Sequence, residues 1–193
     1  MKNIFLSASI PLPDSDEGYF ATADIVAIRE SVVALTTTTL SEHRLIWGGH
    51  PSITPLINYV MQKRKINIQE HVKLYQSRFF ENEFLQENEM FEDIVLTENL
   101  GDKSKSIEVL RNQMFSENEF SAGVFIGGMA GVVDEYKMFV ERFPNALIIP
   151  LASTGGAVKI IYDGLIDDKN KNLRFEKDYG YMSIFQKFLI EKL

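Results

Sequence analysis

The chain of 193 residues contains no cysteine, which excludes disulfide bonds, thiol catalysis and thiolate metal sites. It has three histidines, His43, His50 and His71, and they are too scattered to predict a metal-binding cluster. No apolar run approaches the length of about 18 residues that a membrane helix needs, and the N-terminus is too polar for a signal peptide. We therefore expect a cytoplasmic protein with no metal, no resident cofactor and no membrane partner.

Basic residues are also in deficit, with 20 Lys and Arg against 27 Asp and Glu, for a net charge of -7. A nucleic-acid backbone or an anionic membrane requires a basic face, so the composition argues against both as the main partner. The short basic cluster at residues 63–65 suits the last turn of a helix better than a nucleic-acid patch. A small anionic ligand is compatible with this charge, because helix N-termini supply a local positive potential.

Short apolar runs alternate along the chain with segments of helical spacing, and no linker divides them. We expect one domain over residues 1–193, of class α/β, with a parallel sheet flanked by helices on both faces. Strands are predicted at residues 3–8, 44–47, 71–75, 93–97, 123–126 and 146–150. Helices are predicted at residues 23–37, 53–65 and 103–115, after residue 131, over residues 158–165 and over residues 179–193.

Three glycine pairs follow predicted strands: Gly48-Gly49, Gly127-Gly128 and Gly155-Gly156. At the carboxyl end of a parallel strand, glycine lets the backbone approach a phosphate or a ribose. A helix begins soon after each pair, and its free N–H groups favour an anion. The pattern indicates a nucleotide pocket.

Two carboxylates, Asp134 and Glu135, follow the second glycine pair in the first turns of the next helix. Consecutive helical residues point about 100° apart, so only one of them should face the pocket. For Glu135 we favour contact with ribose hydroxyls, or acid–base work on a glycosidic bond. For Asp134 we favour simple compensation of the helix dipole.

The other two glycine turns are less specific. Residues 48–52 lack the lysine of a Walker loop and the third glycine of a dinucleotide fingerprint. His50 is either a ligand contact or a turn residue. At the last turn, Thr154 offers a hydroxyl beside Gly155 and Gly156, either to a ligand or as an ordinary helix cap.

Three polar residues at other strand ends complete the candidate set. Arg78 directly follows the third strand and either clamps a phosphate or is a solvated surface residue. Ser7 and Ser9 end the first strand and are expected to line the pocket. The predicted ligand-binding residues are Ser7, Ser9, Gly48, Gly49, His50, Arg78, Gly127, Gly128, Met129, Gly131, Glu135, Thr154, Gly155 and Gly156.

Residues 127–135 fit the pattern Gly-Gly-Met-x-Gly-Val-x-x-Glu. This pattern resembles SLOG domains, the sensory branch of the Lonely Guy (LOG) phosphoribohydrolase superfamily. Residues 5–9 and 48–51 also resemble SLOG signatures, so the likeness extends from the first strand to the helix after Gly156. The resemblance implies a Rossmann-like, three-layer fold that binds nucleotides, often ADP-ribose derivatives.

The same resemblance implies two functions. SLOG domains in antiphage systems such as Thoeris sense a cyclic ADP-ribose isomer, and they are usually fused to an effector domain that this chain lacks. The implied partners are therefore a nucleotide, a further copy of the chain in a homodimer or higher oligomer, and a possible effector protein. The alternative is a LOG-type nucleoside 5′-monophosphate phosphoribohydrolase in which Glu135 is catalytic. Ile126 replaces the hydrolase proline, the motif is one residue longer, and the catalytic arginine has no unambiguous counterpart.

Overall fold

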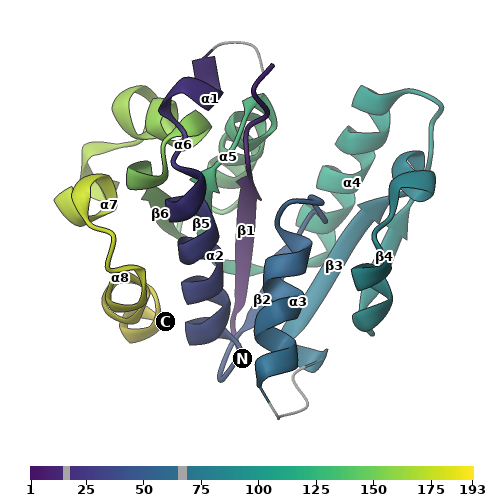
Figure 1. The fold of residues 1–193 in the computed structure, drawn as a ribbon, viewed down its shortest axis with the longest axis horizontal. Coiled ribbons are helices and arrows are strands. Elements are labelled where there is room, and N and C mark those ends of the chain that lie inside the picture. The colour runs from purple at the N-terminus through teal and green to yellow at the C-terminus, as the bar shows by residue number, and fades with distance from the viewer. Residues whose placement is uncertain (15–17, 65–68) are drawn as a thin grey trace.

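The structure is a computed structural model, and it describes residues 1–14, 18–64 and 69–193. Six parallel strands form one sheet in the order β4-β3-β2-β1-β5-β6 (Figure 1). The strands are β1 (Asn3–Ser9), β2 (Arg44–Trp47), β3 (Val72–Ser77), β4 (Ile94–Thr97), β5 (Phe120–Gly127) and β6 (Leu147–Leu151). The predicted α/β, Rossmann-like arrangement is confirmed.

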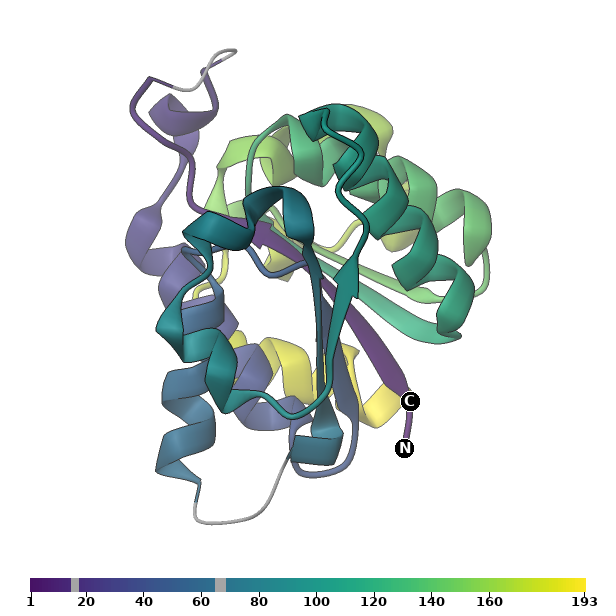
Figure 2. The same cartoon turned by 90° about the vertical axis from the view of Figure 1, so that its right-hand side faces the viewer.

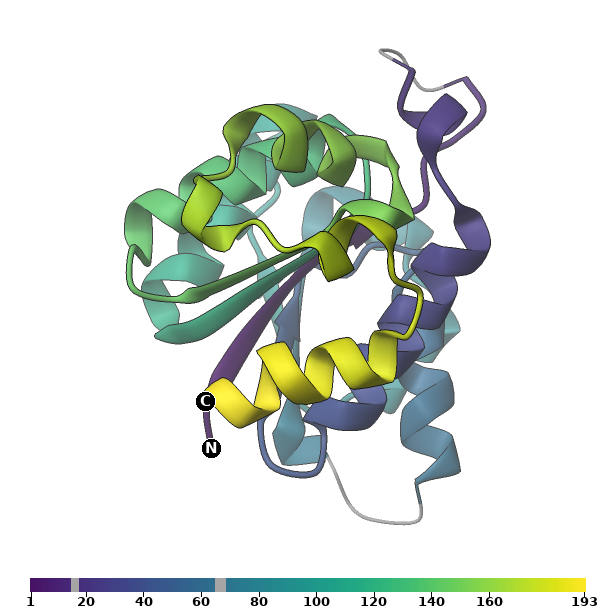
Figure 3. The same cartoon turned by 90° about the vertical axis from the view of Figure 1, so that its left-hand side faces the viewer.

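Helices cover both faces of the sheet (Figures 2 and 3). One face carries α2 (Ile25–Thr39), α3 (Thr54–Lys63) and α8 (Tyr181–Phe188), and the other carries α4 (Lys103–Glu117) and α5 (Ala130–Arg142). The short helices are α1 (Tyr19–Thr22), α6 (Gly156–Ile160) and α7 (Leu173–Lys177). Short 3₁₀ turns lie at Gln69–His71, Arg78–Glu83, Gln86–Met90, Ala152–Thr154, Asp168–Asn170 and Ile190–Lys192, and a π turn at Ile161–Leu165. No helix in these described ranges is both long and apolar enough to span a bilayer.

The two predicted helices nearest the C-terminus differ most from the sequence expectation. The predicted helix over residues 158–165 is a short α-helix that widens into the π turn, and the closing helix ends at Phe188 rather than at the C-terminus. The lysine at position 65 of the basic cluster and residues 15–17 of the loop after β1 lie outside the described residues. Helix α2 starts where Asp24 accepts a hydrogen bond from the Ala27 N–H, which satisfies an N-terminal donor.

The chain reverses its direction across the sheet between β1 and β5. Strands β1 to β4 follow one another outward to one edge of the sheet, and β5 then pairs with β1 on its other side. In this pair Ser7 is opposite Phe125 and Ser9 is opposite Gly127. Such a switch point leaves a crevice at the carboxyl ends of the two strands, where ligands bind in open α/β sheets. The predicted pocket residues from these strands therefore meet at one edge.

An aromatic cluster fixes α5 against this part of the sheet. Phe5 of β1 stacks on Phe139 of α5 with ring centroids 5.3 Å apart, and Phe115 of α4 meets the edge of Phe5 at 5.0 Å. All three rings are buried. Because such rings bury large apolar areas, this contact sets the position and rotation of α5 over β1.

Candidate nucleotide site

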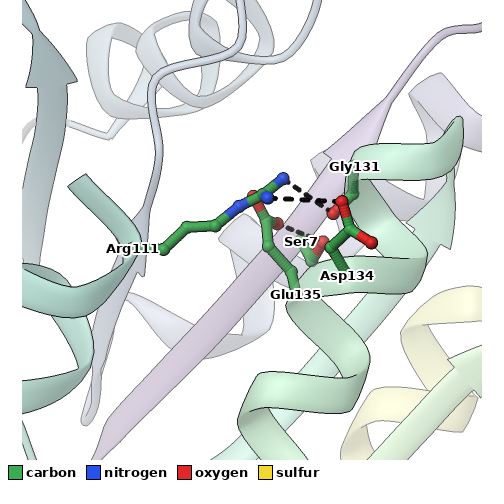
Figure 4. Close-up of polar contacts among 5 residues, drawn as sticks. All are labelled: Ser7, Arg111, Gly131, Asp134 and Glu135. Atoms are coloured by element: carbon green, nitrogen blue, oxygen red, sulfur yellow. Dashed lines mark hydrogen bonds and ion pairs between the residues drawn. The ribbon is translucent and has the colours of Figure 1, made fainter. Parts of the chain in front are cut away.

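Beyond the aromatic cluster, a hydrogen bond between Ser7 and Glu135 also joins β1 to α5. Ser7 lies two residues beyond Phe5 and so on the same face of β1, while Glu135 lies four residues before Phe139 and so on the same face of α5. The Ser7 hydroxyl donates to Glu135 Oε2 at 2.5 Å (Figure 4). The Phe5–Phe139 stack therefore aims Glu135 at the carboxyl end of β1, whereas the side chain of Asp134 is 59% exposed.

Arg111 of α4 reaches the same point from the side (Figure 4). Its Nε donates to Glu135 Oε1 at 3.2 Å, and one terminal nitrogen donates to the carbonyl oxygen of Gly131 at 3.0 Å. The other terminal nitrogen lies 3.5 Å from Oδ2 of Asp134. The Arg111 side chain is only 13% exposed, so this guanidinium is held in place rather than solvated.

Arg111 was not among the predicted site residues. The sequence carries one signal for it: four residues after Ile107 and three before Met114, it falls within the apolar stripe that predicted α4. A charged residue inside a buried stripe needs a partner. No local pattern identifies that partner, because Glu135 lies 24 residues away on another helix.

The backbone N–H groups of the first two glycines of the central turn are hydrogen-bonded within the protein. The Gly127 N–H donates to Thr154 Oγ1 at 2.8 Å, and the Gly128 N–H donates to the Ser9 carbonyl oxygen at 2.8 Å. These bonds tie the ends of β5, β1 and β6 together. Their donors are therefore not free for a ligand in this conformation.

The next N–H groups, at residues 129–131, have no acceptor in the part of the chain that the structure describes. They form the N-terminus of α5, where the donors of the first turn lack intrahelical partners and the helix dipole is positive. An anion at this edge would thus meet Met129, Ala130 and Gly131 rather than the glycine pair before them.

The last glycine turn is closed by its own chain. The Gly155 N–H donates to Ala152 O at 3.0 Å, the Gly156 N–H donates to Thr22 Oγ1 at 3.1 Å, and Thr154 is buried. A Cβ on Gly155 would lie 1.8 Å from the Thr22 carbonyl oxygen, and this residue has φ of +67°. The lack of side chains at these glycines leaves room for the segment before α2. A ligand could therefore bond to the N–H groups of this turn only if the hydrogen bonds to Ala152 and Thr22 opened.

The remaining predicted residues lie at the ends of β2 and β3. The turn at Gly48, Gly49 and His50 follows β2, which is the neighbour of β1 on the side away from β5. Arg78 is 48% exposed and pairs with Glu81 at 3.0 Å. It makes no bond to the Arg111–Glu135 cluster, so the arginine of that cluster is Arg111.

A separate hollow of about 430 Å³ is lined by residues of α2 and of the start of α8. These two helices lie on the face of the sheet opposite α4 and α5 (Figure 3). Val26, Tyr179 and Met182 are among its lining residues, and none of the predicted site residues lines it. Within residues 1–14, 18–64 and 69–193, no three His, Cys, Asp or Glu side chains gather as a metal-binding group.

The profile of the SLOG cluster3 family matches residues 18–189. The chain belongs to the SLOG cluster3 family. This confirms the resemblance seen in the Gly-Gly-Met-x-Gly-Val-x-x-Glu segment, and SLOG membership together with the fold supports a nucleotide-binding Rossmann-like domain.

The SLOG chain is also similar to a solved structure, the X-ray structure of the structural-genomics target TM1055. The two share 16% identity with a TM-score of 0.62, and the alignment covers 100% of each chain. At this identity the likeness shows the fold alone. A search of curated proteins found no significant match.

Proposed function

We propose that this SLOG domain is a sensor that binds a nucleotide where β1 and β5 end, with ADP-ribose or a cyclic ADP-ribose isomer as the ligand, in antiphage or stress signalling. The observation that carries the proposal is the Ser7–Glu135–Arg111 cluster beside the free N–H groups of α5. A carboxylate, a guanidinium and a helix N-terminus within one site are the groups that ribose and phosphate need.

The charges at this site favour a ribose phosphate over a simple anion. Arg111 is already compensated by Glu135 and Asp134, and the chain as a whole is acidic. A bare anion would add negative charge next to two carboxylates. A ribose phosphate instead offers hydroxyl donors to Glu135 while its phosphate accepts from the α5 N-terminus and from Arg111.

Signalling would follow from the link between α4 and α5. In this structure Arg111 joins the two helices through the first turn of α5. A phosphate that draws the guanidinium away would change how α4 packs, and so alter association with a further copy of the chain or with an effector protein. We propose both partners on this ground.

The alternative function is cleavage of the N-glycosidic bond of a nucleoside 5′-monophosphate. The contact of 3.2 Å between Arg111 and Glu135 favours it, since it supplies an arginine beside the carboxylate. In this reaction Arg111 would hold the phosphate, and Glu135 would take a proton from water as the water oxygen bonds to the anomeric carbon and the N-glycosidic bond breaks. Glu135 would then pass that proton to the departing base, which restores the carboxylate.

The two functions are separated by one experiment. Thermal unfolding is measured with AMP, ADP, NAD, ADP-ribose and its cyclic isomers, and each incubation is then analysed by HPLC. A sensor gives a raised midpoint with an intact ligand, because selective binding to the folded state stabilises it. Free base released from a monophosphate would instead identify the hydrolase, and no shift with any nucleotide would refute both.

Glu135→Gln supplies the second arm of this experiment. In a sensor it changes affinity and no turnover is seen with either protein, whereas in a hydrolase it abolishes turnover and retains the nucleotide. Glu141→Gln is the matched control, because Glu141 is an exposed carboxylate on the same helix.

A further inference from the structure

A chain of hydrogen bonds joins the loop after β1 to the turn after β2. The Ile10 N–H donates to Ser52 Oγ at 3.1 Å, and Ser52 Oγ lies 2.9 Å from His50 Nδ1. The Ser52 N–H donates to the same Nδ1 at 3.2 Å. None of these contacts is used by the Arg111–Glu135 cluster.

These contacts fix the tautomer of His50. A backbone N–H can only donate, so Nδ1 must accept from Ser52 and cannot itself carry a proton. The Ser52 hydroxyl accepts a hydrogen bond from the Ile10 N–H and donates one to Nδ1, which agrees with Nδ1 as an acceptor. The neutral imidazole therefore carries its proton on Nε2.

The Nε2–H group is open to a ligand. No residue in the described part of the chain bonds it, and Nε2 is not among the buried side-chain nitrogens without a partner there. In the sheet, Leu6 of β1 is paired with Trp47, the last residue of β2. Ser9 follows Leu6 by three residues, and His50 follows Trp47 by three residues. The imidazole thus belongs to the strand end next to the proposed site.

We propose that His50 is a specificity-determining residue whose Nε2–H donates to an uncharged acceptor of the nucleotide, a ring nitrogen or carbonyl oxygen of the base or a ribose oxygen. This inference rests on the nucleotide site proposed above. A neutral donor supplies no charge to offset a phosphate in an acidic chain. The phosphates therefore belong at α5 and Arg111, and the uncharged part of the ligand extends to the β2 turn.

Burial supports the neutral state, because it lowers the pKa of His50 to about 4. No charged side chain of the described residues contributes to this shift. His50 then stays neutral throughout pH 6–8, and its contribution to binding should not vary over that range.

The tautomer is tested first, by long-range ¹H–¹⁵N correlation spectra of histidine-labelled protein. The chain has three histidines, and His50→Gln assigns the signals of His50 by their loss. We expect a spectrum with Nε2 protonated and Nδ1 unprotonated, both in the wild type and in Ser52→Ala, where the backbone donor remains. A proton on Nδ1 would refute the inference without any reference to a ligand.

The role in binding is tested with ADP-ribose and AMP as probes. Glutamine places an N–H donor near the position of Nε2, whereas leucine has none. His50→Leu should weaken binding about fivefold to tenfold, the usual range for one lost hydrogen bond, and His50→Gln less than threefold. His71→Gln is the control, and thermal unfolding verifies that each variant is folded.

The outcomes separate this inference from the function on which it rests. Wild-type affinity in His50→Leu, with binding still lost in Arg111→Ala, would refute the role of His50 alone. A wild type that binds neither probe nor any other nucleotide of the panel would refute the proposed function and this inference together.

Discussion

Ser7 Oγ donates to Glu135 Oε2 across 2.5 Å, and this bond joins the end of β1 to α5 over 128 residues of sequence. It is the polar continuation of the Phe5–Phe139 stack on the same two faces. The aromatic contact supplies the position of α5, and the hydroxyl fixes the orientation of the carboxylate. Glu135 is thereby held in place in the unliganded protein, which would reduce the ordering cost of binding the proposed nucleotide.

Ser7→Ala should lower the free energy of unfolding by about 1–2 kcal/mol, because it removes a donor from a half-buried carboxylate. Urea denaturation measures this change. Ser41→Ala is the control, since Ser41 is exposed and makes only a long contact of 3.4 Å to Thr38 O. Equal stability of the two variants would show that the Ser7–Glu135 bond contributes nothing to the fold.

Arg111→Ala should weaken ADP-ribose binding at least tenfold, because it removes the charge-assisted donors beside the α5 N-terminus. Arg111→Lys should recover part of the loss, since it restores the charge but not the planar fork that contacts Glu135 and Gly131. Isothermal titration at two salt concentrations measures both variants.

Arg142→Ala provides the control for Arg111, because Arg142 also joins α5 to α4, through Asn112. This contact is exposed and lies at the other end of α5. If both alanine variants weaken binding equally, Arg111 acts through helix packing and not by contact with the ligand.

Gly155→Ala should destabilise the fold by about 3 kcal/mol or more. The new Cβ would lie 1.8 Å from the Thr22 carbonyl oxygen, which cannot move without breaking the contact between α1 and the last glycine turn. Gly101→Ala separates the two costs, since Gly101 has φ of +75° but open space around it. Gly101→Ala should lower the free energy of unfolding by about 1 kcal/mol. If chemical denaturation finds the same loss in both variants, the positive φ accounts for the whole destabilisation and the contact with Thr22 for none of it.

The sheet and its helices were predictable because their signals are local. The strands are apolar runs, and the helices repeat apolar residues at helical spacing, as in residues 103–115. The glycine pairs lie at or just after the ends of strands, as predicted. The sequence does not show which neighbouring group in the fold requires a glycine there. At Gly155 that group is the Thr22 backbone of the same chain, a contact over more than 130 residues that no local pattern encodes.

The candidate site was predictable only in part for the same reason. Glu135 was identified by its distance from a glycine turn, which is a local property of α5. Arg111 depends on how α4 packs beside α5, and Arg78 was favoured because it directly follows a strand. The structure pairs Arg78 with Glu81 at the surface, three residues along the chain, so contact between Arg78 and a phosphate stays a prediction.

Stability should fall as the solution is acidified from about pH 6.5 to pH 4. Burial lowers the pKa of His50 to about 4, below the usual 6.5, so over this interval the unfolded chain binds a proton that the folded chain does not. His50 therefore contributes its full stability above about pH 6.5 and loses up to roughly 3 kcal/mol by pH 4. Urea denaturation at intervals of pH measures the slope.

His50→Gln should flatten this slope, because glutamine does not titrate. Burial also lowers the pKa of His43, so the slope that remains above about pH 5 in this variant should decrease further in the double variant with His43→Gln. Below that pH, Glu117 still contributes a slope, because its hydrogen bonds to Tyr75 and Gln113 lower its pKa. An unchanged slope in His50→Gln would mean that the folded protein takes up this proton as readily as the unfolded chain. His50 would then become partly charged between about pH 6 and pH 8, and its proposed contribution to nucleotide binding would vary over that range instead of staying constant.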